Sequence, residues 1–146
     1  MQQFEKLKNK LETEGIFSLN NKVDIPNSPN HIGIVTSSST AAFQDIISTV
    51  KRRAPNSQIS LSDAMVQGDN AHISIINALN RIILHNEKNP HNKIDVVILS
   101  RGGGSIEDLW CFNNEDLARE IFTYPIPTIS GVGHEIDFTI CDFVCD

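Results

Sequence analysis

Short apolar runs alternate with longer segments of helical periodicity along most of the chain. Strand-like runs at residues 31–37, 57–66, 93–100 and 126–132 are followed by helix-like segments at residues 39–53, 68–86, 113–123 and 134–146. Strands separated by helices of roughly 10–20 residues indicate a parallel sheet with right-handed crossovers and helices on both faces. The pattern therefore predicts an open, mainly parallel α/β sheet of about four strands, Rossmann-like or flavodoxin-like, with strand order 2-1-3-4.

The residues before position 31 follow a different pattern. Phe4, Leu7 and Leu11 form a helical stripe, and Gly15 lies where a helix C-cap is expected. Residues 20–31 contain two prolines and few apolar side chains, which indicates a connector. We expect residues 1–30 to form an N-terminal helix and linker, and residues 31–146 an α/β domain truncated at its C-terminal side. The polar stretch 85–93 is expected to be a surface loop.

Charge is distributed unevenly along the chain. The formal net charge is −6, but residues 1–93 carry 10 Lys and Arg against 8 Asp and Glu, whereas residues 94–146 carry 2 against 10. An acidic half argues against an autonomous nucleic-acid clamp, because such affinity comes mainly from several Lys or Arg side chains that neutralise phosphates. Phosphate chemistry at one concentrated site is not excluded.

Composition narrows the class of protein further. Hydrophobic residues make up 40% of the 146 positions, a normal globular proportion, and no apolar run approaches the roughly 18 residues of a membrane span. The first residues resemble no secretory signal. The three cysteines are an odd number, which favours reduced thiols. We expect a cytoplasmic protein with no membrane association.

Unusual residues follow each predicted strand. A hydroxyl run that includes Ser37 follows the first strand and leads into a helix carrying Asp45. Such hydroxyls can cap a helix or present donors to an anion. In open α/β sheets, ligands bind beyond the carboxyl ends of the strands, so this edge is the candidate site.

The third strand ends in Arg101 and a glycine-rich loop. Three consecutive glycines let a backbone approach an anion closely, and a guanidinium can form a bidentate pair with it. We interpret this loop as a phosphate site formed with Ser37 and the residues Gly102, Gly103, Gly104 and Ser105. A flexible loop with an incidental arginine is the alternative.

The fourth strand is followed by His134 and Asp137, which are three residues apart. If a helix starts near residue 133, both side chains lie on one face of its first turn. A histidine near a carboxylate can move protons at neutral pH, although a structural histidine is the alternative.

Three stretches of this sequence resemble a known family. Residues 32–47, 101–121 and 131–146, with Val-Gln-Gly at 66–68, are similar to the catalytic domain of the exodeoxyribonuclease VII large subunit. The resemblance implies an exonuclease that cuts single-stranded DNA into short oligonucleotides with a small helical partner subunit. It also implies a preceding oligonucleotide-binding barrel and a following helical region, so we expect residues 1–146 alone to be inactive. The family's catalytic positions correspond to Asp45, Arg101, His134 and Asp137.

These residue types suit phosphodiester hydrolysis. Arg101 and the glycine amides would stabilise charge on the phosphate oxygens, and His134 would act as general base or acid with Asp137 orienting it. Asp45 would complete the proton relay or help to hold a divalent ion. Cofactor use stays open: Mg²⁺ is a candidate, with Asp45, Asp137 and Asp142 as candidate ligands.

Two other functions are compatible with parts of the sequence. The glycine loop and the hydroxyl run alone would serve a non-catalytic phosphate- or nucleotide-binding α/β module, for which His134 and Asp137 are superfluous. A structural segment that joins two flanking regions is a third hypothesis.

Overall fold

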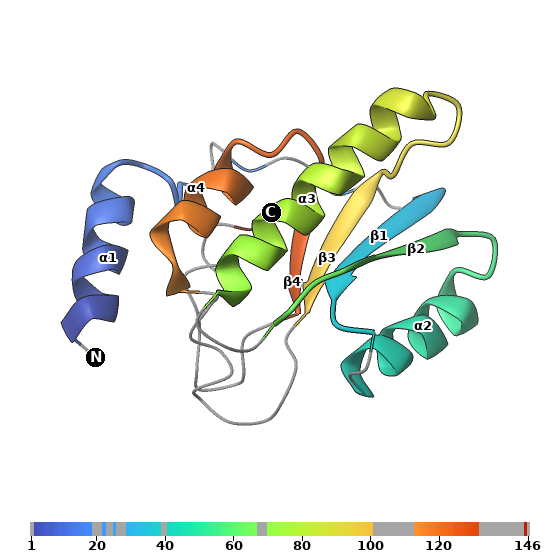
Figure 1. Cartoon of the computed structure of the whole chain (residues 1–146), viewed down its shortest axis with the longest axis horizontal. Coiled ribbons are helices and arrows are strands. Elements are labelled where there is room, and N and C mark those ends of the chain that lie inside the picture. Colours follow the sequence, from blue (N-terminus) through green and yellow to red (C-terminus); the bar gives the residue numbers. More distant parts are fainter. Residues whose placement is uncertain are drawn as a thin grey trace.

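The sheet has four parallel strands in the order β2-β1-β3-β4, as the sequence predicts (Figure 1). The strands are β1 (His31–Thr36), β2 (Gln58–Asp63), β3 (Val96–Ser100) and β4 (Thr128–Gly131). The computed structural model describes residues 2–18, 22, 25, 29–38, 41–66, 70–100, 113–131 and 145. The expected last helix, at residues 134–146, lies outside these residues except for position 145.

Helices cover both faces of the sheet, which confirms the predicted α/β class (Figure 1). Helix α2 (Ala41–Arg53) packs through Phe43, Ile46 and Val50 on one face. Helices α3 (Ala71–Lys88) and α4 (Glu115–Phe122) lie on the other face, over the larger of the two apolar clusters. Residues of β1 and β3 alternate between the two clusters, so these two central strands are covered on both sides.

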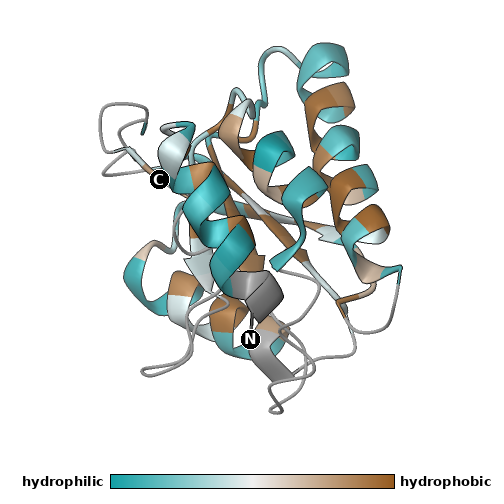
Figure 2. Cartoon of the chain, turned by 90° about the vertical axis from the view of Figure 1, so that its left-hand side faces the viewer, coloured by the Kyte–Doolittle hydropathy of each residue, from teal (hydrophilic) through white to brown (hydrophobic). Residues whose placement is uncertain are grey.

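Helix α1 (Gln2–Thr13) lies beside α4 and contributes to the same core (Figure 1). Leu11 is fully buried and Ile16 is 4% exposed. The helix ends at Thr13, and Gly15 two residues later has a φ of 82°, the left-handed conformation predicted for this capping position. Ile16 N–H donates to the Leu11 carbonyl and Gly15 N–H to the Glu12 carbonyl, the two bonds of a Schellman motif. The outer side of α1 is largely hydrophilic (Figure 2).

Helix α3 continues beyond its expected end. The sequence predicts a polar loop from His85, but the helix runs to Lys88, so that prediction is wrong for its first four residues. Polar residues such as Glu87 and Lys88 are good helix formers on a solvated face, and the helix ends just before Pro90, which disfavours helical geometry at the preceding residue. The Asn86 side chain holds the segment that leads into β3. It accepts from Ile94 N–H at 2.8 Å and donates to the Ile94 carbonyl at 3.2 Å.

Candidate active site

The carboxyl ends of the four strands form one row across the sheet. Asp63 is opposite Thr36, and Ser100 is opposite Gly131. Val35 pairs with Leu99, which brings Thr36 next to Ser100. Neighbouring strands are about 4.8 Å apart, so the segments that leave this row start close together. The crevice beyond such strand ends is the usual ligand site of an open α/β sheet.

Two polar groups organise the end of β1. Thr36 is fully buried, and its Oγ1 has no hydrogen-bond partner among the described residues. Ser38 N–H donates to Asp63 Oδ1 at 2.9 Å, which ties the end of β2 to the loop after β1. This bond holds the loop that carries Ser37, a predicted phosphate-binding residue, which is half-buried.

Asp63 was not singled out in the sequence. A signal did exist, because Asp63 is the last residue of a strand and therefore belongs to the ligand edge. In the sequence, Asp63 is an ordinary polar residue at the end of a strand, and only the strand pairing shows its contact with Ser38.

Asp45 lies on α2 and is exposed to solvent. Phe43 and Ile46, on either side of it in the sequence, pack on the sheet and thereby fix the direction of the helix face that carries Asp45. None of the hydrogen bonds among the described residues involves Asp45, so the structure does not bring it into contact with Ser37 or Asp63. Its part in a shared site therefore stays a prediction.

The other predicted site residues lie outside the described residues. They are Arg101, Gly102, Gly103, Gly104, Ser105, His134, Asp137 and Asp142. Their points of attachment are described, however. Arg101 follows Ser100, which is 2% exposed, and His134 comes three residues after Gly131, the register partner of Ser100. The two segments that carry the arginine and the histidine thus leave adjacent strands at the same level.

Helix α4 begins shortly after the glycine-rich segment. Asn114 is its N-cap, and the Asn114 side chain accepts from Leu117 N–H at 3.0 Å. Glu115 and Asp116 occupy the first turn, where negative charge complements the helix dipole. The start of α4 is therefore well defined by local chemistry.

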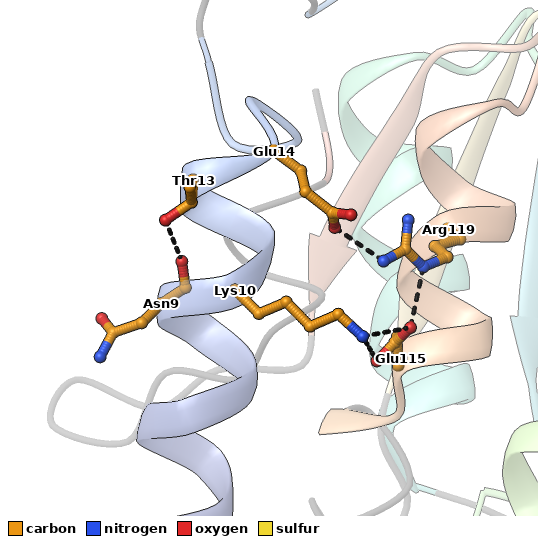
Figure 3. Close-up of polar contacts among 6 residues, drawn as sticks. All are labelled: Asn9, Lys10, Thr13, Glu14, Glu115 and Arg119. Carbon is orange, nitrogen blue, oxygen red and sulfur yellow. Dashed lines mark hydrogen bonds and ion pairs between the residues drawn. The ribbon is translucent and has the colours of Figure 1, made fainter.

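An ion-pair chain holds α1 against this part of α4 (Figure 3). Lys10 Nζ lies 3.0 Å from Glu115 Oε1, and Arg119 bridges Glu115 and Glu14 at 3.0 and 2.7 Å. The hydrogen bond from Lys10, followed by that from Arg119, lowers the pKa of Glu115 below its ordinary value. Because these side chains are 35–55% exposed, solvent screens the pairs, and each contributes little to stability.

The described residues contain neither a cluster of metal ligands nor a membrane-spanning helix. These contain no group of three or more His, Cys, Asp or Glu that could hold a metal ion. Two of the three candidate Mg²⁺ ligands, Asp137 and Asp142, are outside the described residues. Among the described helices, none is long and apolar enough to cross a membrane. Cys145 is buried, and the other two cysteines lie outside the described residues.

The fold is that of an open parallel α/β protein, and the row of strand ends is its candidate ligand site. Residues 16–146 match the family described as exonuclease VII, large subunit. The chain belongs to this family.

Similarity to individual relatives covers nearly the whole chain. It is 51% identical over 145 residues to the exodeoxyribonuclease 7 large subunit of Vibrio parahaemolyticus, covering 99% of this chain and 31% of that protein. The protein of the same name from Clostridium perfringens strain 13 is 52% identical over 145 residues, covering 99% of this chain and 35% of the relative. The chain thus spans about a third of the length of these curated relatives. Family membership confirms the resemblance.

Proposed function

We propose that this chain is the catalytic part of an exonuclease that hydrolyses phosphodiester bonds of single-stranded DNA and releases short oligonucleotides. Membership in the exonuclease VII large-subunit family supports the class of activity. The strand pairing supports placing the active site at the carboxyl edge of the sheet. Ser100 and Gly131 are paired, and the segments that contain Arg101 and His134 follow them directly.

The residues divide the chemistry among them. Arg101, with the amides of Gly102, Gly103 and Gly104, stabilises negative charge on the phosphate oxygens. His134 transfers the proton, as base toward water or as acid toward the leaving oxygen, and Asp137 orients its ring.

Two further residues act on the side of β1. Asp45 completes the proton relay from α2. Ser37 contributes a donor from the loop that Asp63 anchors.

The remaining functional assignments follow from the family name. A large subunit implies a smaller partner, and we propose that the complete protein works with the small subunit of exodeoxyribonuclease VII on single-stranded DNA in the cytoplasm. The activity is a step of DNA catabolism.

Replacement of His134 by Ala in a complete large subunit assembled with its small subunit tests the proposal. The rate of degradation of labelled single-stranded DNA should fall by about 10²–10⁴-fold, because a proton-transfer group is removed. Strand binding measured by fluorescence anisotropy should change little. His91→Ala is the matched control, because His91 is exposed in the loop at the opposite edge of the sheet.

Undiminished degradation by His134→Ala would remove this histidine from the mechanism. An equal loss in His91→Ala would show that the effect is structural.

A further inference from the structure

Strand β2 is an open edge of the sheet. It pairs with β1 on one side, and no strand of the described residues pairs with its other side (Figure 1). Sheet edges in natural proteins are commonly protected by Lys or Pro residues or by bulges. The sequence of β2, Gln-Ile-Ser-Leu-Ser-Asp, contains neither Lys nor Pro.

Hydrogen bonds show which backbone groups face outward. Gln58 N–H donates to the Asn30 carbonyl and Ala64 N–H to the Thr36 carbonyl, so the even-numbered residues of β2 turn their peptide groups toward β1. In a parallel ladder the direction alternates from residue to residue. The N–H and C=O groups of Ile59 and Leu61 therefore point away from the sheet. They form a template for one more strand.

A groove of about 390 Å³ runs along this edge, between β2 and α3. It is lined by residues 60–63 of β2, by Arg81, Ile82 and His85 of α3, and by Ile94. Ser60 and Ser62 are small, and Gly33 next to Ser60 has no side chain, so β1 and β2 fill little of the space under α3. Ile82 and Ile94 supply the apolar surface of the groove.

The polar side chains of the lining make internal hydrogen bonds. Ser60 Oγ lies 2.6 Å from Nε2 of the buried His31, and Ser62 Oγ donates to the Ala78 carbonyl at 2.9 Å. His85 Nε2 lies 3.2 Å from the Asn92 carbonyl. The Asp63 carboxylate accepts from Ser38 N–H. These groups give the groove a defined shape.

Arg81 supplies the positive charge of the groove, beside the carboxylate of Asp63. Its Nη2 donates to the Asp63 carbonyl on the outer side of β2, and it makes no ion pair with any described carboxylate. The side chain is exposed. A guanidinium has five N–H donors, so most of them are available to a carboxylate beside the edge.

We propose that the groove between β2 and α3 binds an extended, acidic peptide segment of a partner protein as a fifth strand of the sheet. The segment pairs with Ile59 and Leu61 through its main chain, places small apolar side chains toward Ile82 and Ile94, and directs a carboxylate to Arg81. The repeating backbone of a DNA strand fits less well, because its phosphates only accept hydrogen bonds and cannot pair with the outward carbonyls as a peptide main chain does. This interaction surface lies along the lateral edge of the sheet and shares Asp63 with the loop that carries Ser37.

Peptides for the test are selected from a random heptapeptide phage library on the immobilised chain. Phages that also bind the Arg81→Gln variant are removed by counter-selection. We expect the enriched sequences to share one acidic residue among β-branched and small apolar residues. Arg81→Gln should weaken the affinity of a synthetic copy at least tenfold. Arg53→Gln is the matched control, because Arg53 is exposed at the end of α2 and does not line the groove.

Amide exchange followed by NMR locates the bound peptide. In the free chain the amides of Ser60 and Ser62 should exchange slowly and those of Ile59 and Leu61 quickly. The peptide should slow exchange at Ile59 and Leu61, whereas a copy with N-methylated backbone amides should not.

Several outcomes would overturn the proposal. The first is a selection that enriches no peptide. The second is peptides that bind Arg81→Gln as tightly as the parent chain. The third is bound peptide that slows amide exchange in other strands but not at Ile59 and Leu61. Fast-sedimenting dimers with Ile59 and Leu61 already protected would assign the edge to a second copy instead. Loss of nuclease activity in His134→Ala has no bearing on this result, so the two proposals can fail separately.

Discussion

The missing side chain at Gly33 lets two isoleucines approach β1. A Cβ at this position would lie 2.9 Å from Ile94 Cγ2 and 3.3 Å from Ile82 Cδ1. The first distance is shorter than real Cβ contacts, and Ile94 is 4% exposed, so it has little room to move. The glycine is therefore explained by packing, since no positive φ is involved.

Gly33→Ala should lower the free energy of unfolding by about 1–3 kcal/mol, because the added methyl group overpacks the core. Urea denaturation measures the change. In Gly33→Ala combined with Ile94→Ala, the loss should be smaller than the sum of the single losses, because the second change removes the clashing atoms. Strict additivity would contradict this account.

Tyr124 places a hydroxyl group in the core. It is 6% exposed, and its hydroxyl donates to the Leu79 carbonyl of α3 at 2.7 Å. Burial, with a smaller contribution from Glu120, raises the pKa of Tyr124 well above its ordinary value of 10.0. The folded state therefore holds this proton more tightly than the unfolded state does.

The stability that Tyr124 contributes should be fully present below about pH 10 and should be lost as the pH rises through its folded-state pKa. Tyr124→Phe should lower the free energy of unfolding at pH 7 by about 0.5–1.5 kcal/mol through the lost hydrogen bond. Urea midpoints measured from pH 7 to pH 11 should fall more steeply above pH 10 in the parent chain than in the variant. Parallel curves would show that another group controls the alkaline transition.

Among the elements, α1 combines two kinds of contact with the rest of the chain. Leu11 is fully buried in the large core cluster, while Lys10 and Glu14 reach the exposed side of α4 (Figure 3). Apolar burial is worth more than screened ion pairs. Packing therefore holds α1 in place, and the ion pairs adjust its register against α4.

Leu11→Ala should lower the free energy of unfolding by about 2–5 kcal/mol, because it leaves a cavity. Lys10→Gln should cost less than about 1 kcal/mol. An NMR titration should also show the pKa of Glu115 moving up toward its ordinary value of 4.5 in Lys10→Gln. A larger loss in Lys10→Gln than in Leu11→Ala would reverse the proposed order of the two contributions.

Over the whole molecule, the charge differs from one half of the chain to the other. Residues 94–146, which contain Arg101, His134 and Asp137, carry 2 Lys and Arg against 10 Asp and Glu. An excess of negative charge in this half of the chain repels a polyanion, and Arg101 is the positive group available to attract it there. The relative from Vibrio parahaemolyticus is about three times as long as this chain, and in such a protein residues beyond the matched part can also contact and orient a strand.

A polypeptide of residues 1–146 produced by itself should fold but bind single-stranded DNA only weakly and degrade it slowly. Fluorescence anisotropy at low salt, paired with a gel assay, measures both properties. The complete large subunit with its partner is the positive control. Tight binding with rapid degradation by the 146-residue polypeptide would show that this domain is self-sufficient.

The sequence by itself determined the elements and their order in the sheet. The alternation of apolar runs, the C-cap at Gly15 and the break at Pro90 act over a few residues, so the chain pattern contains their signals. The strand order was predicted from the alternation of strands and helices and from the motifs at successive strand ends. Family membership likewise followed from continuous stretches such as residues 101–121.

Only the tertiary structure decided which distant residues meet. The bond between Ser38 and Asp63 and the pairing of Ser100 with Gly131 depend on strand register, and Lys10 meets Glu115 across 105 residues of sequence. Which residues of β2 turn their peptide groups outward, Ile59 and Leu61, likewise depends on how β2 pairs with β1. Such contacts are set by how whole elements pack, because the free energy that fixes them comes from burial shared among many residues.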